Sequence, residues 1–334
     1  MSEGSGPAGA SIGPVDAWQR RHSVLGFPVA VVYKFIDDFG GYMCALLTYY
    51  AFLSLFPALM LLSTALGIVL QDHPDWSQRI LDSAVSEFPI VGDQLRDTGT
   101  LGGSTTGLVV GGVGALYGAL GVGQALQYVC NQAWMVPRNS RPNPFASRGR
   151  GLLLLAVAGL TIVVTTGLSA YLRGLVPEGA ASWSLTIGSV LINMLVIALV
   201  LRIATSRPLQ LWDVLPGSVV AAVAWQGMQV VGATYVGAVI ERASNLTSVF
   251  AFVLGLLIFL YTLSVVLLLS IEVNVVWKER LWPRALLTPF TDRVVLTMAD
   301  ERAYARLSQA QRLKGFQRVH VRFEPSDPEP DEGS

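Results

Sequence analysis

The stretch GYMCALLTYYAFLSLFPALMLLSTALGIVL, from Gly41 to Leu70, has no charged residue in thirty positions. An α-helix rises about 1.5 Å per residue and the hydrocarbon core of a bilayer is about 30 Å thick, so about twenty such residues can cross it. Five later apolar stretches are of a similar kind. The sequence therefore predicts an all-α, polytopic membrane protein.

The membrane domain is predicted to occupy residues 41–280 and to contain six transmembrane helices. Their expected bounds are 42–70, 106–129, 151–172, 182–201, 214–240 and 246–277. The composition agrees, because only 14% of the residues are charged, against about 25% in soluble proteins. Pro57 in the first segment is an expected kink site.

The segments that flank and connect these helices have their own patterns. Residues 1–40 are expected to be cytoplasmic and to include an interfacial helix over 27–39. The long connection after the first segment places apolar residues at helical spacing over Trp76–Leu95. This pattern predicts an amphipathic helix that either lies at the outer interface or packs on the bundle.

The C-terminal part changes character. Residues 281–323 are predicted to form a cytoplasmic tail, with one or two short helices over 292–314 and strand-like alternation over 316–323. Residues 324–334 combine proline with acidic residues and are predicted to be disordered.

The positions of the 23 Lys and Arg residues predict the orientation. With a cytoplasmic N-terminus, nineteen fall on the cytoplasmic side and four on the other. The short connection that holds Arg138, Arg141, Arg148 and Arg150 has no acidic residue. The positive-inside rule therefore places both termini in the cytoplasm.

Several stretches resemble one family. They read ALLTYYAFLSLFPALMLL (45–62), GVGALYGALGVGQALQYVCNQAW (112–134), LWDVLPGSVVAAVAWQ (211–226), TYV (234–236) and LLIFLYTLSVVLLLSIEVN (256–274). In this order they resemble the YihY/BrkB-type inner-membrane protein family, formerly labelled ribonuclease BN-like. The resemblance covers roughly residues 25 to 280 and implies six spans with both termini inside.

The old family label suggests an enzyme, but the residues speak against one. RNA hydrolysis needs a metal-activated water or a positioned acid and base. His22, His73 and His320 lie in separate segments, and none has an acidic residue or cysteine at ligand spacing. The chain also lacks a GxxxxGK[ST] motif and a nucleic-acid recognition motif. We therefore expect no enzyme activity, no cofactor, no metal and no nucleic-acid partner.

Polar residues inside the apolar segments are the candidate functional residues. Glu272 is the one formal charge within the six segments. It could be hydrated near the cytoplasmic interface, pair with an arginine at a span end (Arg148, Arg150 or Arg202), or couple to a substrate or a proton. The polar residues proposed to line a cavity or translocation route are Tyr49, Tyr50, Ser54, Gln124, Gln127, Asn131, Asn193, Gln226, Glu272 and Asn274. Interhelical hydrogen bonds would explain most of them equally well.

The second segment is rich in glycine. Gly107 and Gly111, and Gly114 and Gly118, are small-xxx-small pairs that let helix backbones approach closely. Close helix packing is the simpler interpretation. A flexible, sliding helix in a transporter is the alternative.

Two functions follow from these observations. The first is transport or translocation of an amphiphile, such as an envelope lipid or an exported metabolite, because the predicted bundle combines polar residues with no catalytic cluster. The second is a non-transporting scaffold for envelope assembly. In both cases membrane lipids are expected partners, while protein partners stay open.

The topology can be tested by labelling single cysteines. In a background without Cys44 and Cys130, an impermeant maleimide added to intact cells should label a cysteine at Ser86, because this serine is predicted to be external. It should not label one at Ser147 or Ser308. Labelling at Ser308 but not at Ser86 would show the reverse orientation.

Overall fold

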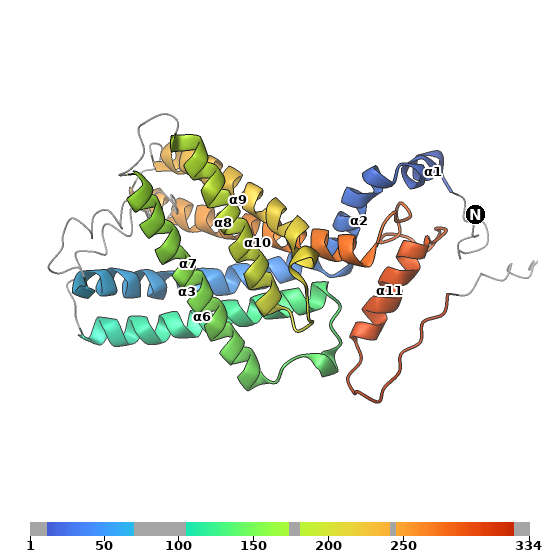
Figure 1. Cartoon of the computed structure of the whole chain (residues 1–334), viewed down its shortest axis with the longest axis horizontal. Helices are drawn as coiled ribbons and strands as arrows, with labels where there is room; N and C mark the ends of the chain where they lie inside the picture. Colours follow the sequence, from blue (N-terminus) through green and yellow to red (C-terminus); the bar gives the residue numbers. More distant parts are fainter. Residues whose placement is uncertain (1–11, 70–104, 174–180, 241–244, 324–334) are drawn as a thin grey trace, which may run out of the picture.

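The computed structural model describes residues 12–69, 105–173, 181–240 and 245–323 (Figure 1). All the regular secondary structure in these ranges is helical, so the all-α prediction is confirmed for the described part of the chain. Six helices are long: α3 (Gly40–Val69), α6 (Thr105–Ala133), α7 (Pro144–Arg173), α8 (Ala181–Ala204), α9 (Leu211–Ile240) and α10 (Asn245–Glu279). They overlap the six predicted segments.

One stretch of these helices, Val253–Glu279, is long and apolar enough within the described residues to cross a membrane. Gly40–Leu55 and Val190–Ala204 are shorter apolar helical stretches. Six crossings of the membrane and a cytoplasmic location of both termini stay predictions. The amphipathic helix expected over Trp76–Leu95 and the acidic end at 324–334 lie outside the described residues.

The six long helices form a closed ring. Each helix contacts the next one along the chain, from α3 through α6, α7, α8 and α9 to α10, and α10 in turn contacts α3. Figure 1 shows α3 and α6 side by side along the length of the molecule. The contact between α3 and α10, which we call the seam, therefore joins the first and last long helices.

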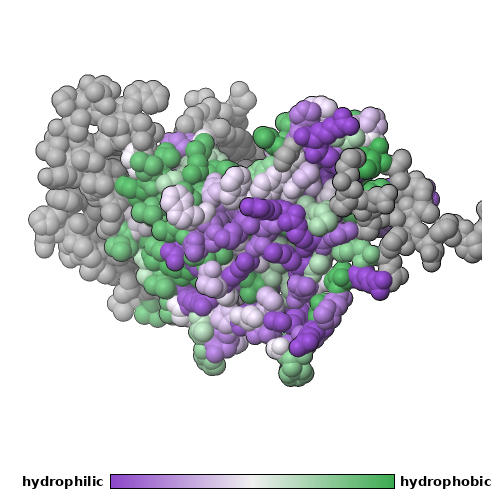
Figure 2. Space-filling view, turned by 45° about the vertical axis from the view of Figure 1, so that its right-hand side comes forward, coloured by the Kyte–Doolittle hydropathy of each residue, from purple (hydrophilic) through white to green (hydrophobic). Residues whose placement is uncertain are grey.

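Among the residues whose burial the structure describes, the main buried core lies at one end of this ring. It combines the start of α3 (Cys44, Leu47), the end of α6 (Val129, Cys130) and the end of α10 (Leu268 to Val276) with the facing ends of α8 and α9. Figure 2 shows hydrophilic residues concentrated on one part of the visible face and hydrophobic residues on the other. The end where the charged connections meet is the end predicted to be cytoplasmic.

Short helices are docked against this end. α2 (Ser23–Asp37) follows α1 (Pro14–Arg21) and contacts α10, and Phe27 packs edge-on against Trp277 and Trp282. Phe39, in the left-handed conformation with φ 56°, ends α2 and lets the chain turn into α3.

The tail forms one helix, α11 (Met298–Ala310), which begins with a capping box between Thr297 and Asp300. The fully buried Arg284 joins α11 to α2, because its guanidinium donates to Asp300 at 2.7 Å and to Asp37 at 2.5 Å. The Arg284 guanidinium also lies 5.2 Å from the Tyr304 ring centroid. These contacts fix the tail on the bundle.

The strand-like alternation at residues 316–323 was misleading. The described structure has no strand there, and the segment runs as irregular chain with Phe316 exposed. A strand needs a neighbouring strand for its backbone hydrogen bonds, and even a lone two-stranded hairpin is only marginally stable. The described part of the chain supplies no such partner.

Glycines bring several helix backbones into contact. A Cβ built on Gly118 of α6 would lie 2.5 Å from the Cα of Ser54 in α3, and one on Gly123 would lie 2.9 Å from the Cα of Gly151 in α7. A Cβ on Gly217 of α9 would overlap the carbonyl oxygen of Ser270 in α10. Gly114 is half-buried. For Gly107, Gly111 and the Pro57 ring, the packing environment lies outside the described residues.

Replacing Gly217 by alanine should destabilise the protein by about 1–3 kcal/mol, because α9 must move away from α10 to avoid Ser270. Gly227→Ala is the matched control in the same helix, since nothing lies within 4 Å of its added Cβ. Alanine there should leave stability unchanged or raise it by about 0.5–1 kcal/mol. Thermal melting in detergent measures both, and equal effects would contradict the close contact.

Candidate functional site

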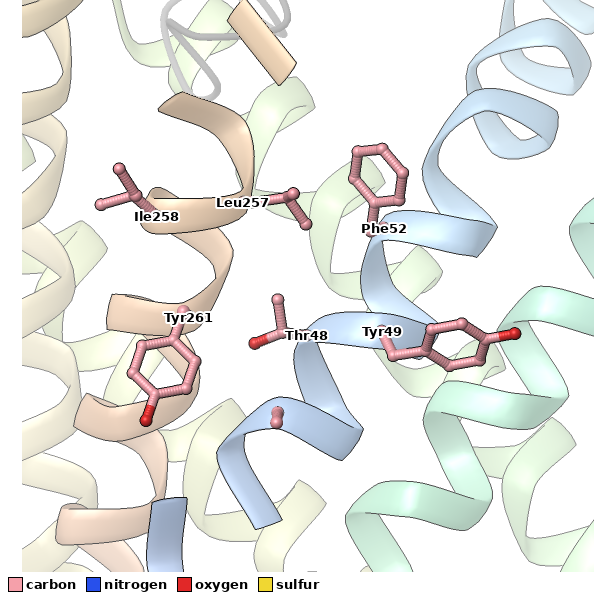
Figure 3. A pocket seen from close by; sticks show the side chains of 7 residues that line it. Thr48, Tyr49, Phe52, Leu257, Ile258 and Tyr261 are labelled. Carbon is pink, nitrogen blue, oxygen red and sulfur yellow. The ribbon is translucent and has the colours of Figure 1, made fainter. Parts of the chain in front are cut away.

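A pocket of about 430 Å³ opens at the seam between α3 and α10. Its walls are almost entirely apolar, although three of its lining residues, Thr48, Tyr49 and Tyr261, carry hydroxyl groups. Figure 3 shows Thr48 pointing toward α10 and Leu257 pointing toward α3, while the ring of Tyr49 points away from α10. The pocket therefore lies between the first and last long helices.

The pocket is closed on the side toward the charged end of the ring, which is the end where α2 and α11 are docked. The hydroxyls of Thr48 and Ser264 lie 3.3 Å apart across the seam, and each also donates to a carbonyl of its own helix. Cys44, Leu47 and Leu268 are buried beyond them. These side chains separate the pocket from the charges beneath it.

A fully buried charge cluster lies beneath this layer, where α2 meets α10. The ammonium of Lys34 bonds the Oδ2 of Asp38, one turn further along α2, and its Nζ lies 3.5 Å from the Oε2 of Glu272 on α10. All three residues are at most 2% exposed. Glu272 thus pairs with a lysine that comes from outside the six long helices, and not with any of the arginines proposed from the sequence.

The electrostatics of α2 follow from this burial. Burial lowers the pKa of Lys34, but the carboxylates of Asp38 and Glu272 outweigh it and hold the pKa above its ordinary value, so Lys34 stays charged. Burial raises the pKa of Asp38, and the neighbouring Lys34 offsets this only in part. Asp38 also caps the C-terminus of α2, where the helix dipole disfavours a carboxylate.

Two predicted polar residues of α6 form hydrogen bonds to α7 and to the connection between α8 and α9. The amide nitrogen of Gln127 donates to the carbonyls of Gly123 and Ser147, and its oxygen accepts from the Ser147 hydroxyl. The side-chain oxygen of Asn131 accepts from the backbone N–H of Ser206 at 2.7 Å. These bonds tie the end of α6 to its neighbours.

Asn274 has a similar structural contact, because its oxygen accepts from the N–H of Gly217 at 2.6 Å. On α3, Tyr50 packs against Gly121 and Ser54 against Gly118. The structure therefore shows helix contacts at these three predicted positions.

The remaining predicted residues lie apart from this group. Tyr49 lines the pocket, Gln124 is exposed, and Asn193 and Gln226 are half-buried. The ten residues do not converge on one described cavity. Instead they divide among the pocket, the buried cluster and hydrogen bonds between segments.

Sequence reasoning missed four residues that build these sites. Lys34 and Asp38 form an i, i+4 pair on a helix whose other face is apolar, with Val24, Val32 and Ile36 exposed. A helix with apolar residues on one face and a charged pair on the other can bury the charged face, so the sequence could have indicated these buried charges. Thr48 and Ser264 gave no comparable signal, because hydroxyls that bond the preceding turn are common in apolar helices.

Comparison with known proteins identifies a family. Residues 31–290, more than three quarters of the chain, match the family described as Virulence factor BrkB. No curated protein and no solved structure matches the chain. The match spans α3 through α10 and the last seven residues of α2, so it covers both the pocket and the buried cluster.

Removing the cation of the cluster should be costly. Lys34→Met leaves Asp38 and Glu272 buried without an ammonium and should destabilise the protein by about 3–5 kcal/mol. The loss should be smaller at acidic pH, where both carboxyls can be protonated. Lys278→Met is the control, because the 41% exposed Lys278 pairs with Asp213 at the surface, and it should cost only about 0–1 kcal/mol. Similar melting shifts for the two variants would contradict the buried cluster.

Proposed function

Since the chain belongs to the BrkB family of membrane proteins, we propose that it is a multi-pass protein of the bacterial inner membrane that moves an amphiphile, an envelope lipid or an exported metabolite, through the bilayer. The six-span topology with both termini in the cytoplasm is part of this proposal. Membrane lipids are then its solvent and its source of substrate.

The exposed residues of the long helices support the multi-pass arrangement. Large apolar side chains face outward on α6, α7, α8 and α9 in positions such as Val113, Leu153, Leu195 and Val223. Soluble monomers rarely expose continuous apolar surface of this kind, whereas lipid tails cover it at no cost. The outward face of α2 is apolar as well.

The pocket at the seam is the observation that carries the transport proposal. Its size lies in the range of small-molecule sites, and its apolar walls suit the apolar part of an amphiphile. It is closed toward the charged end by Thr48, Ser264 and Leu268. Movement of α10 against α3 would open or close it, because these two helices form its walls.

The scaffold hypothesis also has an observation in its favour. Gln127, Asn131 and Asn274 are engaged in hydrogen bonds between segments and are buried. A bundle that only supports partners needs such bonds and needs no pocket. The two hypotheses therefore differ in whether the pocket has a function.

Filling the pocket tests this difference. Leu257→Trp adds a bulky ring to the α10 wall of the pocket and should lower the transport rate to that of empty vesicles without loss of folding. The assay follows a fluorescent phospholipid across liposomes that contain the purified protein. Leu191→Trp, at an exposed leucine of α8 away from the pocket, is the control and should transport as the wild type does.

Two outcomes would count against transport through the pocket. If Leu257→Trp and Leu191→Trp transport equally fast, the pocket does not lie on the route. If the wild type is no faster than empty vesicles over a broad panel of amphiphiles, the scaffold function is favoured.

A further inference from the structure

Three carboxylate oxygens at the contact of α2 and α10 have no hydrogen-bond partner. They are the Oδ1 of Asp38 and both oxygens of Glu272. Neither carboxyl group is accessible to solvent, since Glu272 is 0% and Asp38 2% exposed. Buried polar atoms are nearly always bonded, and an unbonded one that carries charge costs several kcal/mol. Ionising both carboxyl groups in this environment is therefore unfavourable.

The charges of the cluster do not balance. Lys34 supplies one positive charge, and Asp38 and Glu272 as carboxylates supply two negative ones. The nearby Asp37 is already paired with Arg284, which Asp300 also engages. Cys44 from α3 and Cys130 from α6 are buried in the same core, and a thiol carries no positive charge, so they do not balance it. The buried group carries one uncompensated negative charge.

One bound proton would neutralise the excess negative charge and also supply a hydrogen-bond donor for the unbonded oxygens. Two carboxylates can only accept hydrogen bonds, so none can join them. A protonated carboxyl can donate, and the carboxyl groups of Asp38 and Glu272 lie close together, because both contact the ammonium of Lys34. If Glu272 holds the proton, it can donate to the free Oδ1 of Asp38, while the Oδ2 of Asp38 keeps its bond to Lys34. The cluster then has one positive and one negative charge.

We propose that Glu272 and Asp38 share one bound proton, so that the Lys34–Asp38–Glu272 cluster is a proton-binding site that holds α2 against α10. This inference rests on the geometry of the cluster and not on the transport proposal. Loss of the proton would leave a net negative charge in the core. The docking of α2 should therefore weaken as the pH rises, because the docked state binds a proton that the released state does not.

Infrared spectroscopy of the purified full-length protein tests the site directly. At neutral pH the wild type should show the C=O stretch of a protonated carboxylic acid in a buried environment, and the band should shift in D₂O. The band should be lost in Glu272→Gln and also in Asp38→Asn, because either change leaves a single carboxylate paired with Lys34. Each introduced amide can donate the hydrogen bond that the proton supplied, so both variants should stay folded.

Glu279→Gln is the matched control. Glu279 also lies at the end of α10, but Arg207 and Arg306 both pair with it, so it needs no proton. This variant should keep the infrared band. In Glu272→Gln the melting temperature should no longer fall as the pH rises from neutral to alkaline, whereas it should still fall in the wild type and in Glu279→Gln.

The same experiment separates a proton from a metal cation. The spectra and melting curves are compared in buffers with sodium and with choline as the cation. A band that is present in both buffers supports the proton site. A band that appears only without sodium, together with higher melting temperatures in sodium, would show that the site binds sodium and would overturn the proposal. Absence of the band at neutral pH in both buffers would overturn it as well.

Discussion

The structure depends on how charge is tolerated where α2 meets the long helices. Removing an ion from water costs several kcal/mol, and only close partners repay that cost. Lys34 and Asp38 lie one turn apart on α2, and Glu272 faces them from α10. Asp37, the residue before Asp38, pairs with Arg284 instead. Two adjacent acids at the end of α2 thus connect this helix to the last long helix and to the tail.

The anchoring cluster lies inside the buried core. Among the residues whose burial the structure describes, Leu268, Ile271 and Val275 are fully buried around Glu272, at the end where α2, α10 and α11 meet. The seam pocket lies further along the same two long helices, and its residues Phe52 and Leu257 are partly buried. The buried charges and the pocket are thus separated along α10.

Backbone contacts complete the ring where side chains are small. Gly118 and Gly123 let α6 touch α3 and α7, and Gly217 lets α9 touch α10 at Ser270. In a lipid environment the hydrophobic effect does not drive helices together, so close packing and interhelical hydrogen bonds take its place. The bond from the Gly217 N–H to Asn274 is of this kind. The ring therefore combines close contact with a few buried polar bonds.

The sequence by itself determined the helical class and the places of the long helices, because an uncharged run such as Gly41 to Leu70 has few other stable structures. It also singled out Glu272, since a charge in such a run stands out. Only the tertiary structure decided the partner of Glu272, because Lys34 lies more than two hundred residues away in a helix that reads as separate. The sequence could not predict the seam pocket either. Periodicity shows which face of a helix is apolar, but it does not show which helices pack against each other to close the ring. The strand-like pattern at 316–323 failed for the same reason: local alternation cannot supply the partner strand that a β-structure needs.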